Sequence, residues 1–378
     1  MNYERDNLQN NYPTSTYCPY YDQGLYIGST QSGDTKIAMC CWQDKHIVDK
    51  VDFNDPYLLD ARQQAKTKIP TVCSTYCRQP NHIANERERS QGEHYWTPGN
   101  KIKKLHLEQS LACNLTCISC SSLYSSAWNT NYHLFDSTTP TIRLKKDPES
   151  AWEHLDLSEI EHIHFTGGEP LMNHDNLKIL EHLDSIGRLS SVSLSYSTNG
   201  TIRPTARWIE LWSRAHWIRL FFSLDGVGST FEYTRYPAQW SEVEENIQWF
   251  RELTGPCILI EVDAIVGIHN IFNLPEFYAW WKESCQTGNQ GDPSQIFVRG
   301  IESVSFGGEA LNVKYLPDRY RADAESVLQS LSELPGAMGL FRSLCKENST
   351  MWLEYFTKLD RLRNTNWRTA LSGPIIKY

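Results

Sequence analysis

The chain has 378 residues, which is long enough for two or three domains. With 21% charged and 40% hydrophobic residues, its composition excludes a disordered, collagen-like or low-complexity protein. The formal net charge of -9 argues against a nucleic-acid partner, and no apolar run approaches the about 18 residues that a membrane span needs. The start of the chain is polar and lacks the apolar core of a signal peptide, so we expect a cytoplasmic protein without a membrane partner.

In chain order, the N-terminal part contains little helical periodicity, and short apolar segments begin to alternate with amphipathic ones at about residue 101. Helices are expected at 177–189, at 240–255 and over much of 315–370. Strands are expected at 103–108, 160–165, 191–196, 217–222, 258–266 and 295–301.

Six strand–helix units in series predict a parallel sheet with right-handed crossovers. A closed barrel of this kind has eight units, so six predict an α/β fold with an open, partial (β/α)6 barrel, whose chemistry lies at the C-terminal ends of the strands. The chain then divides into a Cys-rich module at 1–100, the barrel at 101–305 and a helical extension at 306–378.

The 11 cysteines are the unusual feature of the composition. An odd number without a visible export signal disfavours a disulfide framework and favours metal binding or redox chemistry. They fall into an early group, a compact trio and three isolated residues: Cys18, Cys40, Cys41, Cys73 and Cys77, then Cys113, Cys117 and Cys120, and finally Cys257, Cys285 and Cys345. For the isolated three we expect buried, unreactive thiols; the alternative is a hydrogen donor that quenches a radical, for which Cys345 is the candidate.

The trio has the spacing C-x3-C-x2-C and directly follows the first expected barrel strand. Three thiolates on one short loop can bind three irons of a cubane cluster and leave the fourth iron open to another ligand. The alternative is a structural zinc site, which needs a fourth Cys or His nearby. His106 precedes the trio but lies within the expected strand, so the spacing favours the cluster.

Motifs at the ends of the first four expected strands resemble the radical S-adenosylmethionine (SAM) superfamily. They are CNLTCISC at 113–120, TGGEP at 166–170, YSTNG at 196–200 and FSLDG at 222–226, in the order that this family shows. The resemblance implies that Cys113, Cys117 and Cys120 bind a [4Fe–4S] cluster whose open iron is chelated by SAM. It also implies reductive cleavage of SAM to a 5′-deoxyadenosyl radical, which takes a hydrogen atom from a C–H bond.

The same resemblance implies a set of SAM contacts. Gly167, Gly168 and Glu169 would meet the amino group, Ser197, Asn199, Ser223 and Asp225 would line the ribose and carboxylate side, and Val266 with Gly267 would flank the adenine. The residue before the third cysteine is often aromatic in this family and is Ser119 here. We therefore expect Tyr124 or Ile268 to pack on the adenine.

The early cysteines resemble the SPASM or twitch auxiliary modules of radical SAM maturases, although here the module precedes the barrel. The resemblance implies that Cys18, Cys40, Cys73 and Cys77 hold a second [4Fe–4S] cluster, with Cys41 as the alternative to Cys40. A zinc knuckle with the same ligands is the other interpretation.

Together these features resemble the maturases of ribosomally made peptides, which epimerise, crosslink or excise parts of a precursor peptide. Oxidation of a small molecule by a radical SAM dehydrogenase is the alternative, and a non-catalytic zinc-binding adaptor is a remote one. No leader-binding winged helix is recognisable, so we expect a separate small recognition protein, and a flavodoxin or ferredoxin as electron donor. Arg235 and Glu302 are expected on the site side, as substrate contacts or as partners in salt bridges.

Overall fold

The computed structural model describes residues 23–30, 32–41, 43–67, 101–129, 150–286, 296–300, 309–334, 336–347 and 349–377. Within these residues a nine-stranded sheet has the order β3-β2-β1-β4-β5-β6-β7-β8-β9. Its strands are β1 (Gly24–Ser29), β2 (Thr35–Ala38), β3 (His46–Val48), β4 (Lys104–Glu108), β5 (His162–Phe165), β6 (Ser193–Thr198), β7 (Trp217–Ser223), β8 (Ile258–Val266) and β9 (Ile296–Gly300).

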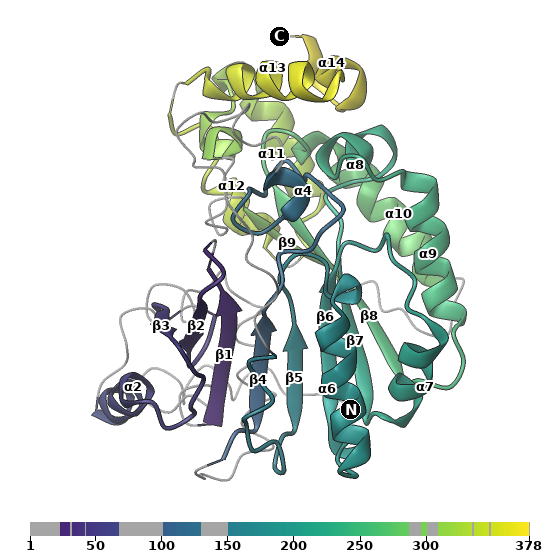
Figure 1. Cartoon of the computed structure of the whole chain (residues 1–378). Coiled ribbons are helices and arrows are strands. Elements are labelled where there is room, and N and C mark those ends of the chain that lie inside the picture. The colour runs from purple at the N-terminus through teal and green to yellow at the C-terminus, as the bar shows by residue number, and fades with distance from the viewer. Residues whose placement is uncertain are drawn as a thin grey trace.

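Strands β4 to β9 form the predicted partial barrel. Each pairs in parallel with the next, from Lys104 opposite His162 to Val266 opposite Gly300. The crossovers carry α6 (His174–Ser185), α7 (Ala206–Arg214), α8 (Gly228–Thr234), α9 (Trp240–Glu252) and α10 (Leu274–Gln286). Figure 1 shows α6, α7, α9 and α10 along the outside of the sheet. The predicted partial (β/α)6 fold is confirmed, with strand ends within two residues of those expected.

The three N-terminal strands continue the barrel sheet. β1 pairs in parallel with β4, from Gly24 opposite Lys104 to Gly28 opposite Glu108, and β2 and β3 follow as antiparallel neighbours. The helix α2 (Pro56–Thr67) comes after them. One sheet therefore crosses residue 100, where the sequence places a boundary between a Cys-rich module and the barrel.

The sheet has an apolar and a polar face. Alternation along β4 buries Leu105 and Leu107 among the core residues, whereas His106 is half-buried on the opposite face. The same alternation in β5 buries Ile163 and Phe165. Because the helices cover the apolar face, the hydrophobic core lies between helices and sheet, and the polar face lines the inside of the barrel.

The C-terminal part is helical, as predicted, with α11 (Arg321–Ser330), α12 (Ala337–Phe341), α13 (Met351–Arg363) and α14 (Trp367–Ala370). Figure 1 shows these helices, with the short α4 (Ser126–Asn129), at the end of the molecule towards which the parallel strands point. Among the described helices, none is both long and apolar enough to span a membrane.

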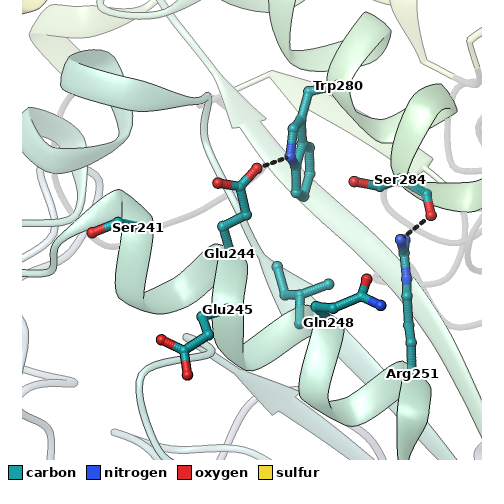
Figure 2. Close-up of a pocket in the computed structure, with 8 residues that line it drawn as sticks. Ser241, Glu244, Glu245, Gln248, Arg251, Trp280 and Ser284 are labelled. Carbon is teal, nitrogen blue, oxygen red and sulfur yellow. Dashed lines mark hydrogen bonds between the residues drawn. The ribbon is translucent and has the colours of Figure 1, made fainter. Parts of the chain in front are cut away.

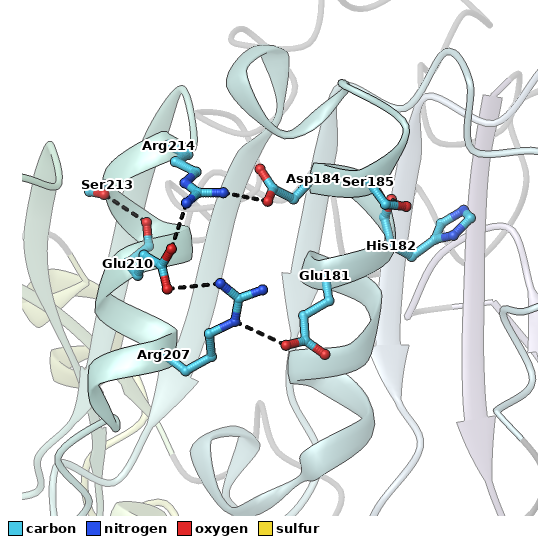
Figure 3. A network of polar contacts seen from close by, with 8 residues as sticks. All are labelled: Glu181, His182, Asp184, Ser185, Arg207, Glu210, Ser213 and Arg214. Carbon is cyan, nitrogen blue, oxygen red and sulfur yellow. Dashed lines mark hydrogen bonds and ion pairs between the residues drawn. The ribbon is translucent and has the colours of Figure 1, made fainter.

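The outer surface carries an ion-pair network between α6 and α7 (Figure 3). Arg207 contacts Glu181 and Glu210 at 3.0 and 2.8 Å, and Arg214 contacts Asp184 and Glu210, both at 2.5 Å. These side chains lie at the surface and are 26–47% exposed, so each pair contributes about 0–1 kcal/mol to stability. The network belongs to the helical layer and not to the strand ends.

Candidate active site

The loops that follow the parallel strands bring the predicted motifs to one edge of the sheet. The cysteine loop follows β4, the Gly-Gly-Glu turn follows β5, Asn199 follows β6, and Asp225 follows β7. Since parallel strands end on the same side, residues up to 112 positions apart in the sequence become neighbours there.

The Gly-Gly-Glu turn forms main-chain hydrogen bonds with the segment between β4 and Cys113, where the cysteine loop begins. The amide of Gly168 donates to the carbonyl of Ser110 at 2.9 Å, and the amide of Glu169 donates to the carbonyl of Ala112 at 2.7 Å. A Cβ atom on Gly168 would lie 2.1 Å from the Ala112 oxygen, so only glycine permits this approach. The turn thus fixes the chain immediately before Cys113.

Glu169 joins the ends of β5 and β6. Its buried carboxylate accepts hydrogen bonds from the amide of Leu171 at 3.2 Å, from the Thr198 hydroxyl at 2.9 Å and from the amide of Asn199 at 2.8 Å. Burial raises the pKa of Glu169 to about 7, although these hydrogen bonds lower it in part. The side chain proposed to meet the SAM amino group is therefore engaged with protein donors.

The three thiols of the trio lie close together. Burial raises the pKa of Cys113 to about 11, and the neighbouring Cys117 contributes to this rise. Burial also raises the pKa of Cys120, with contributions from Cys117 and Cys113. Burial raises the pKa of Cys117, whereas Arg235 lowers it. Such thiols lose their protons most readily when a cation binds them, because a metal centre supplies the compensating charge.

Two nitrogen donors point at these sulfurs. The Asn199 side-chain amide lies 4.0 Å from Cys113 Sγ and 3.0 Å from the Asn114 oxygen. Arg235 Nη1 lies 3.8 Å from Cys117 Sγ. A loop of three thiols, with Cys117 buried and Cys113 and Cys120 half-buried, together with N–H donors fits the donor set of an iron–sulfur cluster. Within the described part of the chain, no group of three or more His, Cys, Asp or Glu side chains is arranged to hold a single metal ion.

Asp225 ties β7 to β8 and to Arg235. One carboxylate oxygen accepts the amide of Ile265 at 2.9 Å, and the other lies 2.7 Å from Arg235 Nε. The Asp225 carbonyl accepts from the Asn270 side chain at 2.8 Å. Like Glu169, this predicted SAM contact has its carboxylate bound to protein groups.

Comparison with known proteins identifies the domain. The family model of the Radical SAM superfamily matches residues 108–273, which contain all four strand-end motifs. The chain contains a radical SAM domain. This domain, over residues 108–273, indicates an enzyme. No curated protein matches it.

Solved structures with a similar arrangement share little sequence with this chain. Native anSMEcpe with bound AdoMet has a TM-score of 0.41 and 18% identity, and the match covers 61% of this chain and 59% of anSMEcpe. Streptococcus suis SuiB bound to the precursor peptide SuiA has a TM-score of 0.36 and 11% identity, with 93% and 79% covered. The chain thus spans less than two thirds of the length of anSMEcpe.

The remaining predicted SAM contacts of the radical SAM domain lie along the same edge. Ser197 is half-buried at the end of β6, and its hydroxyl lies 3.5 Å from His164 Nε2. Ser223 is the half-buried last residue of β7, and Val266 is the buried last residue of β8. A Cβ on Gly267 would lie 2.5 Å from the carbonyl oxygen of Leu311, so the C-terminal extension packs closely against this strand end.

Tyr124 and Ile268, the two residues expected to pack on the adenine of SAM, differ in solvent exposure. Ile268 is buried, and its amide donates to the carbonyl of Leu311 at 2.7 Å. Tyr124 is half-buried, with Lys36 Nζ 6.0 Å from its ring centroid, and burial raises its pKa to about 12. Tyr124 therefore presents part of its surface on the side of the N-terminal strands.

The inner face of the barrel carries a row of polar side chains that the sequence reasoning missed. His106 Nε2 lies 2.8 Å from the Thr166 hydroxyl, and His164 Nδ1 lies 2.7 Å from the Ser195 hydroxyl. The two imidazoles meet edge to face at 4.8 Å, and the Tyr26 ring lies 5.0 Å from that of His106. Burial lowers the pKa of His106 well below its usual value, and the neighbouring His164 lowers it further. Polar residues at alternate positions of two expected strands were the available signal.

Of the early cysteines, Cys40 and Cys41 lie near the end of this row that Tyr26 forms. Cys40 is half-buried and Cys41 is exposed, just after β2, which runs antiparallel to the barrel strands. Lys45 Nζ donates to the Cys41 carbonyl at 2.6 Å and lies 4.8 Å from the Tyr26 ring centroid. The other three proposed auxiliary ligands, Cys18, Cys73 and Cys77, lie outside the described residues.

The structure describes two of the three isolated cysteines and one of the two expected substrate contacts. Cys345 is buried, as expected, but Cys257 is exposed, so the expectation of a buried thiol was wrong there. The Cys285 side chain and Glu302 lie outside the described residues. Arg235 is on the site side and forms the salt bridge with Asp225.

A separate cavity of about 340 Å³ opens between α9 and α10 (Figure 2). Glu244 accepts from Trp280 Nε1 at 2.6 Å, and Arg251 donates to the Ser284 carbonyl. The cavity lies in the outer helical layer and contains none of the strand-end motifs.

Proposed function

We propose that this radical SAM enzyme holds a [4Fe–4S] cluster through Cys113, Cys117 and Cys120 and modifies a ribosomally made precursor peptide. When bound, the cluster and SAM supply a 5′-deoxyadenosyl radical that abstracts a hydrogen atom. The observation that carries the proposal is the loop of three neighbouring thiols with N–H donors, placed at the strand ends of a radical SAM domain.

The chain's own residues have distinct tasks in this proposal. The Gly-Gly-Glu turn fixes the segment before Cys113, and the Glu169 carboxylate accepts a hydrogen bond from the Asn199 amide. Asn199 and Arg235 donate towards the thiolate sulfurs. Gly167, Gly168, Ser197, Ser223 and Val266 remain the proposed SAM contacts, whereas Glu169 and Asp225 would act on SAM by positioning their loops. The protein then contributes to the rate of hydrogen abstraction by excluding water and by placing one C–H bond of the substrate next to the radical.

We further propose a second [4Fe–4S] cluster, held by Cys18, Cys73, Cys77 and either Cys40 or Cys41. The support is that Cys40 and Cys41 follow β2 at the edge of the sheet where the parallel strands begin, whereas the trio follows the edge where they end. A peptide bound along the polar inner face would lie between the trio and the pair formed by Cys40 and Cys41. A flavodoxin or ferredoxin is the proposed electron donor.

Anaerobic reconstitution with iron and sulfide tests the radical SAM activity. With SAM and dithionite, we expect 5′-deoxyadenosine and methionine from the wild-type enzyme and none from the variant in which Cys113, Cys117 and Cys120 are all alanine. Stoichiometric zinc without iron, or no 5′-deoxyadenosine from a fully loaded enzyme, would refute the proposal.

The same triple variant tests the second cluster, since it retains the early cysteines. We expect it to bind about four irons per chain, and Cys40→Ala or Cys41→Ala in this background identifies the ligand by loss of that iron. Coexpression with a short peptide encoded beside the enzyme, followed by mass spectrometry, tests the substrate. A modified small molecule with an unchanged peptide would support the dehydrogenase alternative instead.

A further inference from the structure

The described part of the barrel contains two buried arginine–carboxylate pairs with the same Nε-to-oxygen distance. Arg219 on β7 lies 2.7 Å from Glu261 on β8, and their side chains are 7% and 0% exposed. Arg235, just after α8, lies 2.7 Å from Asp225, and their side chains are 9% and 0% exposed. Burying such a pair costs desolvation energy, so a pair of this kind indicates a specific role more than a gain in stability.

Only one of these two pairs reaches a cysteine of the trio. Arg235 uses Nε for Asp225 and Nη1 for Cys117 Sγ, at 3.8 Å. Asp225 is in turn fixed by the amide of Ile265. A guanidinium is planar and always charged, so one side chain can hold the carboxylate and present a cationic N–H to the sulfur at the same time.

A cationic donor on a cluster thiolate affects the two redox states unequally. Reduction adds negative charge, which spreads onto the sulfurs, so a nearby positive charge and an N–H···S hydrogen bond stabilise the reduced state more than the oxidised one. The interaction is little screened because both Arg235 and Cys117 are buried. Its removal should therefore lower the reduction potential.

We propose that Arg235, held by Asp225, is a positioning residue that raises the reduction potential of the cluster bound by the cysteine trio. This inference rests on the proposed function, because it requires Cys117 to be a cluster ligand. The Arg235 side chain acts through Cys117 and needs no contact with SAM or substrate.

The test is a redox titration of the anaerobically reconstituted full-length enzyme, followed by electron paramagnetic resonance. The signal that changes when SAM is added identifies the cluster with the open iron. In Arg235→Lys the charge stays, but an ammonium cannot span both Asp225 and Cys117. We expect the ratio of reduced to oxidised cluster at a fixed potential to fall about tenfold, which corresponds to about 59 mV for one electron.

Two further variants distinguish an effect of Arg235 on the reduction potential from an effect on folding. Arg235→Gln combined with Asp225→Asn replaces the ion pair by two amides and should also lower the potential. The matched control is Arg219→Lys, which weakens the other buried pair and should leave the potential unchanged.

Several outcomes would overturn the tuning role of Arg235. Wild-type potential in both Arg235 variants would overturn the proposal, as would an equal shift in Arg219→Lys. Loss of iron from both Arg235 variants would assign Arg235 to holding the loop and would also overturn the tuning role. A wild-type enzyme with iron but no signal responsive to SAM would refute the proposed function itself.

Discussion

At the scale of single residues, the site depends on buried polar groups with defined partners. Glu169 and Asp225 each place a carboxylate where two loops meet, and each has its oxygens bound to protein donors. Because an unsatisfied buried carboxylate is costly, these contacts hold the loops in one arrangement. The carboxylates thereby position Cys113 and Cys117 indirectly.

The raised pKa of Glu169 predicts a pH-dependent stability. The folded pKa of about 7 exceeds the ordinary value of 4.5, so the folded protein retains a proton that the unfolded chain loses. The free energy of unfolding should fall as pH rises from about 4.5 through 7, by up to about 3 kcal/mol from this group.

Glu169→Gln removes the titration and should flatten that part of the pH profile. The variant is expected to be less stable at pH 5, because its amide nitrogen would face the Asn199 amide in place of an acceptor. Urea unfolding at pH 5, 6, 7 and 8 measures both effects. Identical pH slopes for wild type and variant would contradict the prediction.

At the scale of elements, helix α13 of the C-terminal part forms hydrogen bonds with the cysteine loop. The Tyr355 hydroxyl donates to the carbonyl of Ile118 at 2.8 Å, between the second and third cysteines. Arg363 donates to the carbonyl of Thr116 and, at 3.0 Å, to that of Tyr233. The helix therefore connects the loop to α8, whose end and following residues also bind Thr116 and Ile118 through main-chain hydrogen bonds.

We expect Tyr355→Phe to release iron faster to a chelator than wild type. The variant loses one hydrogen bond to the loop, which is worth about 0.5–1.5 kcal/mol of stability. Tyr278→Phe is the matched control, since that hydroxyl bonds Glu333 at 2.9 Å away from the loop. Equal rates of iron release from wild type and both variants would show that α13 does not hold the loop.

At the scale of the whole molecule, the N-terminal strands extend the barrel wall beyond β4. Ile27 in β1 lies opposite Leu107 in β4 and opposite Ile37 in β2, and all three are buried. A covered β4 edge also avoids strand-to-strand aggregation. We infer that residues 24–48 unfold together with the barrel.

Ile27→Ala tests that inference. It should lower the free energy of unfolding of the whole protein by about 2–5 kcal/mol and shift a single transition in tryptophan fluorescence. Ile47 in β3 is 58% exposed, so Ile47→Ala should change stability by no more than about 0.5 kcal/mol. A partial transition that shifts while the main one stays would show that the N-terminal strands unfold independently.

Local patterns determined most of what could be predicted about this protein. Apolar runs of strand length, alternating with amphipathic segments, predicted the six parallel strands, because side-chain periodicity is a property of neighbouring residues. The C-x3-C-x2-C spacing and the motifs at the strand ends likewise predicted the cysteine loop and the radical SAM resemblance, which the family match then confirmed.

Only the tertiary structure decided the contacts between distant segments. Nothing near Gly24 indicates that β1 pairs with β4, because main-chain hydrogen bonds between strands do not depend on residue type. The 118 positions between Cys117 and Arg235 likewise carry no sign of their contact. Composition had identified 11 cysteines as the unusual feature, and folding placed one of them, Cys117, beside the buried cation that we propose tunes the cluster.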